Sequence, residues 1–308
     1  MGTSELSANL LNAIKKEGCR GKIVSVEHLQ DLNRDINTLH QQDLFDEKFF
    51  AEELNGFDFS ASERFPEAKS LFIVAAPQPS VRVTFKPAGK KLPCIIPPTY
   101  SYETDRKMED LFRLQLEPAG YRVKKAVLPW KLLAVRSGLA RYGKNNITYI
   151  EGLGSFYRLV AFVSDWPSAE DSWGELQTLK DCWECDACTK ACPSGAIGSD
   201  RFLLYAERCI TFHNERQGAF PPWLNPAWHH CLVGCMVCQK VCPANRNLRK
   251  RVVEGPVFSA EETAYLRPGI RQNKLPLETV QKLNQLDMMG YLSVLGRNLQ
   301  ALISKQRL

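Results

Sequence analysis

Cysteine spacing is the strongest chemical signal in the sequence. Nine of the eleven cysteines lie between positions 182 and 242. One run has the pattern C-x2-C-x2-C-x3-C-P, and a second run repeats its last three cysteines and the proline. In such a run three thiolates wrap around one iron–sulfur cube, while the cysteine before the proline leaves the loop to bind a different cube. The runs consist of Cys182, Cys185, Cys188 and Cys192, and of Cys235, Cys238 and Cys242.

The sequence therefore predicts two 4Fe-4S clusters at the spacing of bacterial two-cluster ferredoxins. A cube binds one thiolate per iron, so two cubes need one cysteine more than the seven of the two runs. Cys209 or Cys231 can supply it: Cys231 has the more local spacing, whereas Cys209 stands between the runs. Structural zinc is the alternative, because C-x2-C pairs also hold zinc. Zinc does not explain the third cysteine, the x3 gap or the prolines, so we favour iron–sulfur clusters.

The composition is that of an ordinary globular protein. The chain has 308 residues, of which 44% are hydrophobic and 24% charged. Its longest apolar runs, at 71–76 and 159–163, are far shorter than the roughly 20 residues of a membrane-spanning helix. The N-terminus lacks the basic start and apolar stretch of a secretory signal. We therefore expect a cytoplasmic protein without a membrane partner, whose thiols stay reduced and available to metal.

The formal net charge of +6 permits an anionic partner without requiring one. The densest basic stretches are Lys124–Lys125 and Arg246–Arg251, for which solvated surface and phosphate contact are both open. The motifs of dinucleotide-binding folds, P-loops and serine hydrolases are absent from the sequence. Five histidines make a histidine-based metal catalyst unexpected, and packing against the cluster loops is a sufficient explanation for His229–His230 beside Cys231.

Two iron–sulfur clusters would carry single electrons to an acceptor elsewhere in the chain. Helices and strands in the N-terminal part must position that acceptor. Apolar periodicity predicts helices at 4–18 and 104–118. Runs rich in β-branched and aromatic residues predict strands at 70–77 and 81–85.

Four further segments carry predictions. A hairpin is expected over 146–163, turned by Gly152 and Gly154, and a helix over 130–141 leads into a glycine-containing loop at 142–145. Prolines predict covering loops at 77–79 and 93–98. The end of the chain, 276–308, reads as one or two helices.

Several segments together resemble the epoxyqueuosine reductases, which are cobalamin-dependent iron–sulfur enzymes of transfer-RNA modification related to the reductive dehalogenases. The resemblance covers roughly residues 60–245. The two-cluster part alone is shared with many ferredoxin-like proteins, but SGLARYGKN followed by GSF in the same order makes the resemblance specific. The matching stretches are FPEAKSLFIVAAP at 65–77, KLLAVRSGLARYGKNN at 131–146, GSFYRL at 154–159, CWECDACTKACPSGAI, ERCITF and GCMVCQKVCPAN.

The resemblance implies an α+β fold. An N-terminal α/β corrinoid-binding domain at 1–170, of the nitroreductase and reductive-dehalogenase kind, would precede a two-cluster ferredoxin-like domain at 171–250 and a C-terminal helical segment at 251–308. It also implies the cluster ligands and leaves Cys231 as a spare buried thiol. The first cluster would be held by Cys182, Cys185, Cys188 and Cys242, and the second by Cys192, Cys209, Cys235 and Cys238.

The missing acceptor would then be a corrinoid, to which the clusters pass electrons. The resemblance places it against two loops of the N-terminal domain. The residues implied are Ser137, Gly138, Leu139, Arg141, Tyr142, Gly143, Lys144, Asn145, Gly154, Ser155 and Phe156.

Three departures from the family pattern bear on catalysis. Lys124 stands where the family has the acid thought to donate a proton to the substrate, and an ammonium differs from a carboxylic acid in geometry and pKa. About 65 residues follow Cys242, too few for the helical tail that longer members use on transfer RNA. Arg141–Tyr142 replaces a glycine and an aromatic residue.

These features favour a cobalamin-binding iron–sulfur oxidoreductase of the epoxyqueuosine-reductase type, which passes electrons to a bound corrinoid and either reduces and activates that corrinoid or acts on a different, unknown substrate. One alternative is a genuine epoxyqueuosine reductase, with Lys124, Lys125 and Arg246–Arg251 meeting transfer-RNA phosphates. Another is a ferredoxin-like electron carrier or a non-catalytic corrinoid carrier. A low-potential ferredoxin or flavodoxin is the expected electron donor, a corrinoid protein is a further candidate partner, and transfer RNA is the less favoured one.

Overall fold

The chain folds into two compact units, which we describe one at a time. The computed structural model describes residues 3–60, 64–167, 171–248, 250–266 and 274–305. Unit 1 comprises Met1–Pro77, Tyr102–Cys185 and Asp200–Leu203. Unit 2 comprises Gln78–Ser101, Asp186–Ser199 and Leu204–Leu308.

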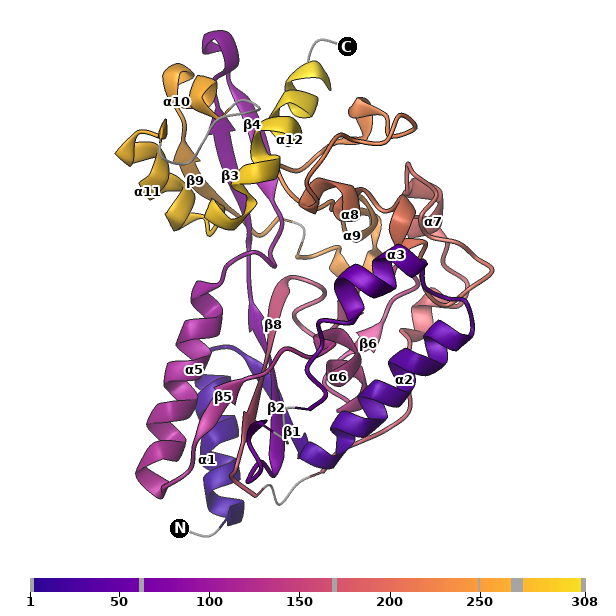
Figure 1. The fold of residues 1–308 in the computed structure, drawn as a ribbon, viewed down its shortest axis with the longest axis vertical. Helices are drawn as coiled ribbons and strands as arrows, with labels where there is room; N and C mark the ends of the chain where they lie inside the picture. The colour runs from indigo at the N-terminus through magenta and orange to yellow at the C-terminus, as the bar shows by residue number, and fades with distance from the viewer. Residues whose placement is uncertain (1–2, 61–63, 168–170, 249, 267–273, 306–308) are drawn as a thin grey trace. The chain divides into compact units, whose positions relative to one another are not determined.

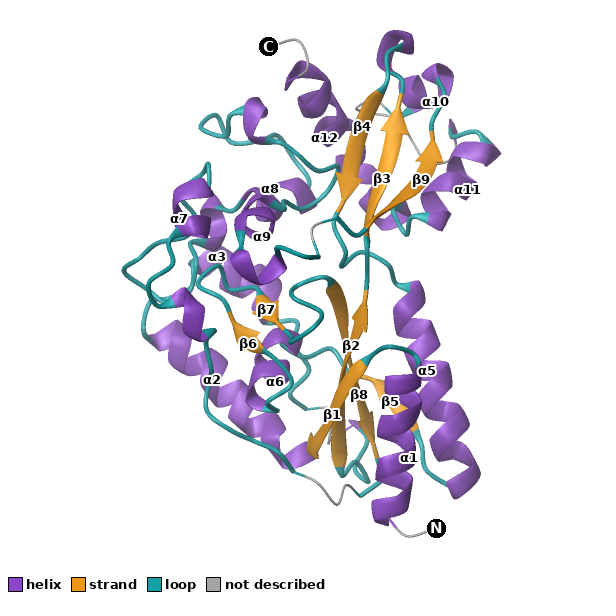
Figure 2. Cartoon of the chain, turned by 180° about the vertical axis from the view of Figure 1, so that it is seen from behind, coloured by secondary structure: helices purple, strands orange, loops and turns teal. Residues whose placement is uncertain are grey.

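Unit 1 is organised around a four-stranded antiparallel sheet of order β1-β2-β8-β5 (Figures 1 and 2). The two central strands are buried along almost their whole length, so both faces of the sheet are covered. This explains why their sequences read as continuous apolar runs instead of alternating ones. The strands are β1 (Arg20–Ser25), β2 (Ser70–Pro77), β5 (Val123–Lys125) and β8 (Tyr157–Ser164).

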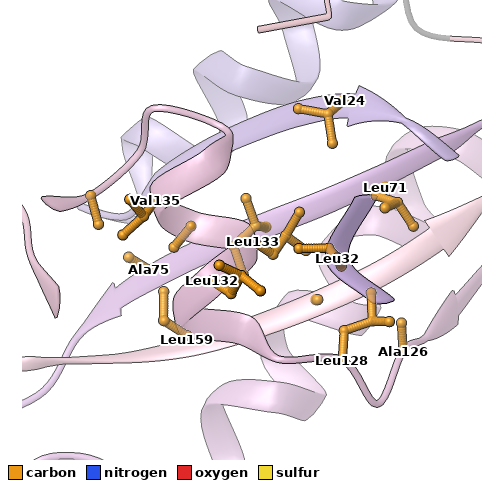
Figure 3. Close-up of a cluster of buried hydrophobic side chains, with 14 of the residues drawn as sticks. Val24, Leu32, Leu71, Ala75, Ala126, Leu128, Leu132, Leu133, Val135 and Leu159 are labelled. Atoms are coloured by element: carbon orange, nitrogen blue, oxygen red, sulfur yellow. The ribbon is translucent and has the colours of Figure 1, made fainter. Parts of the chain in front are cut away.

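Helices cover both faces of this sheet. On one face α1 (Thr3–Lys16) and α5 (Glu103–Leu116) pack against β1, β2 and β8 through a cluster that includes Phe72 and Phe112. On the other face lie α2 (Leu29–Gln41) and α6 (Trp130–Arg136). Figure 3 shows apolar side chains of the core on this second face, which come from α2 and α6 and from strands of the sheet. A short helix, α3 (Glu47–Phe49), begins at Asp46, whose carboxylate accepts a hydrogen bond from the Phe49 N–H group.

The chain between α6 and β8 differs from the sequence prediction. The expected hairpin over 146–163 is wrong, because β7 (Thr148–Tyr149) pairs with β6 (Arg141–Tyr142) and not with β8. Asn146 takes a left-handed conformation (φ 54°), and its N–H donates to the Gly143 carbonyl at 2.9 Å. The turn that joins β6 to β7 therefore starts earlier than the one expected at Gly152.

Helix α6 is also shorter than predicted, since it ends at Arg136 and not at 141. The reason is Gly138, which has φ 72° and whose N–H donates to the Val135 carbonyl at 3.0 Å. A glycine in the left-handed region closes a helix without the steric cost that other residues meet there.

Unit 2 contains a three-stranded sheet of order β4-β3-β9, in which β3 pairs antiparallel with β4 and parallel with β9. The loop expected at 93–98 is wrong for residues 93–96, because Cys94 and Ile96 alternate inward with exposed or half-buried neighbours and form a strand. The elements are β3 (Ser80–Phe85), β4 (Leu92–Ile96), β9 (Val252–Val257), α10 (Ala260–Tyr265), α11 (Leu277–Gln285) and α12 (Leu292–Lys305).

Three short helices of unit 2 belong to the cysteine-rich region. They are α7 (Ala187–Ala191), α8 (Ile210–Glu215) and α9 (Val237–Val241), and α7 lies against α9. Each of α7 and α9 ends where a cysteine precedes a proline, because proline has no N–H to continue the helix.

The predicted mixed fold is confirmed, as are the predicted helices now seen as α1 and α5 and the strands β2 and β3. The C-terminal helices are α11 and α12; the predicted positions 306–308 lie outside the described residues. Among described residues, no helix has the length and apolar character needed to cross a membrane. The compact units do not follow boundaries at 170 and 250, because β3 pairs with β9 from far along the chain. The three functional domains stay a prediction.

Candidate functional site

The two cysteine runs give the same local structure twice. Cys188 lies on α7 and Cys192 caps its end, with the Cys192 N–H donating to the Cys188 carbonyl at 3.0 Å. Likewise Cys238 lies on α9 and Cys242 follows its end. Since α7 packs against α9, the fold pairs the two halves of the motif within unit 2.

Five of the predicted ligands influence one another electrostatically inside unit 2. Burial raises the pKa of Cys235 to about 12, and Cys209 and Cys192 add to this effect. Burial also raises the pKa of Cys238, with further contributions from Cys235, Cys209, Cys188 and Cys192. Thiolates that raise one another's pKa in this way need a compensating positive charge, which the iron–sulfur core supplies. The donor set therefore fits such a cluster.

Cys209 and Cys231 differ in their surroundings. Burial raises the pKa of Cys209, but hydrogen bonds from Thr211 and Phe212 at the start of α8 act in the opposite direction and favour the thiolate. Cys231 is fully buried and burial raises its pKa to about 11, although Lys240, Lys305 and a hydrogen bond from Met236 act in the opposite direction; Cys231 in turn raises the pKa of Cys235 and of Cys94. Both thiols therefore have neighbours that favour the thiolate, and Cys209 as the eighth ligand stays a prediction.

The ligands predicted for the first cluster are divided between the units: Cys182 and Cys185 belong to unit 1, and Cys188 and Cys242 belong to unit 2. Its grouping stays a prediction. In the described part of the chain, no three His, Cys, Asp or Glu side chains are placed to hold one metal ion.

The glycine loop of unit 1 meets the first cysteine run. The Lys144 ammonium donates a hydrogen bond to the Cys185 backbone carbonyl, with an Nζ to O distance of 2.8 Å. The loop behind it is held by Asn145, whose Nδ2 donates to the Tyr149 hydroxyl at 3.0 Å. A Cβ at Gly143 would stand 2.7 Å from both Asn145 Oδ1 and the Tyr149 ring, so only glycine fits there without a rearrangement.

The predicted corrinoid contacts fall into two groups. Gly138 and Arg141 are exposed, Leu139 and Lys144 are half-buried, and a Cβ at Gly138 would meet open space. The backbone is therefore accessible at this turn, and its contact with a corrinoid stays a prediction. The side chains in the second group, together with Gly143 and Gly154, are buried in unit 1 and shape the loops from behind. They are Ser137, Tyr142, Asn145, Ser155 and Phe156.

Lys124 lies away from these loops. It pairs with Val163 near the far end of β8, a strand of eight residues and so roughly 25 Å long, whereas Gly154–Phe156 precedes the start of β8. Its exposed side chain places the ammonium 4.9 Å from the centre of the Phe65 ring. The neighbouring Lys125 points to the opposite face of the sheet, as the alternation of a strand requires.

An ionic cluster around Asp105 was missed by the sequence analysis. Asp105, on α5, is buried and accepts hydrogen bonds from Arg158 of β8 and Lys125 of β5. The Arg158 guanidinium also lies 4.4 Å from the centre of the Tyr102 ring and 5.8 Å from that of Trp130. These residues are far apart in sequence, and only the polar Asp105 on the inner side of α5 hints at them.

Two other predictions concern basic and histidine residues of unit 2. In the stretch Arg246–Arg251, Arg249 lies outside the described residues. His229 is fully buried beside Phe220, with ring centres 4.6 Å apart, whereas His230 is exposed and hydrogen-bonds Lys305. The two histidines therefore have different surroundings, and packing in the protein interior is a sufficient explanation for His229.

Residues 181–245 match the family model described as "4Fe-4S double cluster binding domain". This match confirms the prediction of two 4Fe-4S clusters.

Curated proteins similar to the chain are epoxyqueuosine reductases. The one from Shewanella oneidensis is 29% identical over 174 residues, which span 56% of this chain and 41% of that protein. The one from Escherichia coli K12 is 36% identical over 115 residues, or 37% of this chain and 29% of that protein. The chain thus matches less than half the length of these relatives.

Solved structures show the same likeness in fold. An epoxyqueuosine reductase from Bacillus subtilis aligns over 99% of this chain and 82% of its own, with a TM-score of 0.73 and 21% identity. An epoxyqueuosine reductase solved with a modified tRNA-Tyr stem loop covers the same shares, with a TM-score of 0.70 and 20% identity. The resemblance found in the sequence is confirmed.

Proposed function

We propose that this chain is an epoxyqueuosine reductase, a cobalamin-dependent iron–sulfur enzyme that acts on transfer RNA. One observation carries the proposal: a double-cluster segment and the loop SGLARYGKN lie in one chain that is similar in sequence to epoxyqueuosine reductases. The substrate proposed here is that of the similar enzymes, whereas the sequence features alone favour a different one. The similarity to an enzyme solved with a tRNA stem loop supports transfer RNA as the partner.

Reduction of an epoxide to an alkene consumes two electrons and two protons and releases the oxygen as water. The clusters carry one electron at a time, so the chain needs a low-potential one-electron donor of the ferredoxin or flavodoxin type. Bound cobalamin would supply low-valent cobalt chemistry, which side chains cannot perform.

The chain's own residues would hold and orient these groups. The cysteines of the two runs would bind the clusters, and the accessible backbone of the turn at Gly138 would face the corrinoid. Gly143, Asn145 and Tyr149 fix the loop, while Lys144 connects it to Cys185. Preorganised loops of this kind reduce the entropy lost when a cofactor or substrate binds.

Lys124 favours a second candidate. A lysine at the family's acid position, packed over Phe65, cannot be taken to donate the proton that the reaction needs. The second candidate is therefore an oxidoreductase that uses the same clusters and cobalamin to reduce a different substrate or to activate a corrinoid held by a partner protein.

Turnover separates the two. Anaerobically reconstituted protein with cobalamin, a chemical reductant and epoxyqueuosine-containing tRNA is expected to yield a nucleoside that has lost one oxygen atom, as measured by mass spectrometry. Cobalamin binding, seen as a shift of its visible spectrum, without turnover of this tRNA would support the second candidate. Intact clusters with no spectral shift would contradict both and favour a plain electron carrier.

A further inference from the structure

Lys144 places a positive charge on the backbone of a predicted cluster ligand. Its Nζ lies 2.8 Å from the carbonyl oxygen of Cys185, and both residues belong to unit 1. The lysine is half-buried, so solvent screens its charge less than that of an exposed side chain. In the described part of the chain, its ammonium pairs with no carboxylate.

The position of Lys144 is fixed by the loop that carries it. Behind it, the Gly143 N–H donates to the Ile147 carbonyl at 2.8 Å, and the buried Asn145 bonds to Tyr149. The backbone that carries the charge is therefore held at a defined place. The acidic neighbours of Cys185 in its own run, Asp181, Glu184 and Asp186, are exposed and therefore more strongly screened, and Asp186 also pairs with Lys190.

Reduction of a 4Fe-4S cluster adds one negative charge to the cluster and its thiolates. A nearby cation stabilises the reduced state more than the oxidised one, and a polar contact to a ligand residue acts in the same direction. Removal of the cation should therefore make the cluster harder to reduce.

We propose that Lys144 is a positioning residue that raises the reduction potential of the cluster bound by Cys185 and ties this cluster to the glycine loop. The inference rests on the proposed function, because it requires the cluster. It predicts that a change at residue 144 alters the reduction potential of the cluster bound by Cys185. The potential of the other cluster, whose predicted ligands all belong to unit 2, should not change.

The experiment is a redox titration of the reconstituted holoprotein, monitored by electron paramagnetic resonance, after iron and sulfide analysis. Lys144→Gln keeps a hydrogen-bond donor and removes the charge, whereas Lys144→Arg keeps both. Lys131→Gln is the matched control, because Lys131 Nζ also donates to a backbone carbonyl of this loop, that of Asn146, at 3.4 Å.

We expect Lys144→Gln to lower the midpoint potential of one cluster and leave the other unchanged. Lys144→Arg and Lys131→Gln should both retain the wild-type potentials. Unchanged potentials in Lys144→Gln, or an equal shift in Lys131→Gln, would overturn the role of Lys144. If Lys144→Gln loses iron, Lys144→Arg decides: a wild-type potential supports the proposal and a shifted one contradicts it. Absence of both cluster signals in the wild type would instead refute the double-cluster function.

Discussion

Arg158 and Asp105 form a buried, two-pronged ion pair that joins β8 to α5. The Arg158 Nη2 group donates to Asp105 Oδ2 at 2.9 Å, and Nε donates to Oδ1. Both side chains are less than one-tenth exposed, and Lys125 adds a third hydrogen bond to the carboxylate. Burial alone would raise the pKa of Asp105, but the hydrogen bonds from Arg158 and Lys125 outweigh it and lower the pKa. The carboxyl group is thus held ionised.

Asp105→Asn should therefore destabilise the protein strongly. The amide keeps the shape but leaves the Arg158 guanidinium buried without its counter-charge, which costs about 3–5 kcal/mol. Urea unfolding measures the loss. Glu109→Gln is the control on the same helix, since Glu109 pairs with the half-exposed Arg113 at 2.7 Å and should cost less than about 1 kcal/mol. Equal losses of unfolding free energy in the two variants would show that the buried ion pair contributes no more to stability than the exposed one.

The sequence predicted what depends on local spacing. The C-x2-C runs, the apolar face of α5 and the long buried strand β2 each follow from residues close together in the chain. Structure that depends on distant partners was missed. Cys94 lies in a strand because β3 pairs with it, although the surrounding prolines suggest a loop.

In the candidate site, too, features set by local spacing could be predicted and contacts between distant residues could not. Cysteine spacing predicts the ligands, but it cannot predict the contact of Lys144 with Cys185, which joins residues 41 positions apart. The sequence placed Lys124 at the acid position, yet strand alternation sends Lys124 and Lys125 to opposite faces of the sheet. Lys125 therefore reaches Asp105, and a motif comparison could not reveal this partner.

The eighth ligand can be tested by two matched cysteine variants. Cys209→Ser should lose the iron of one cluster, because it removes a thiolate from the group that includes Cys235 and Cys238. Cys231→Ser should retain the iron of both clusters. Iron and sulfide analysis with the visible absorbance measures the outcome. Iron loss in Cys231→Ser together with full iron in Cys209→Ser would reverse the assignment.

Gly143→Ala should disturb the glycine loop. The new Cβ would stand 2.7 Å from Asn145 Oδ1 and from the Tyr149 ring, and these two side chains hold each other in place. We expect a stability loss of about 1–3 kcal/mol and weaker cobalamin binding in a spectral titration. Gly174→Ala is the control, because the nearest atom to its Cβ is 4.0 Å away. Wild-type cobalamin affinity in Gly143→Ala would separate this loop from the cofactor site.

His229 should make the stability of the protein depend on pH. It is fully buried, and neither ring nitrogen has a hydrogen-bond partner among the residues that the structure describes. Burial, followed by the charges of Arg297, His230 and Lys305, lowers its pKa to about 4. The folded protein therefore keeps the ring neutral at a pH where the unfolded chain, with a pKa near 6.5, binds a proton.

This histidine's contribution to stability is thus constant above about pH 6.5 and falls as the pH decreases toward 4, by at most roughly 3 kcal/mol. His229→Leu, which is similar in volume, should flatten this part of the pH profile in thermal unfolding. It should also stabilise the protein at neutral pH by about 1 kcal/mol, because two unsatisfied nitrogens are removed. His230→Gln, at an exposed position, should change the profile less. A steep loss of stability in His229→Leu at neutral pH would mean that the ring nitrogens have partners in solution.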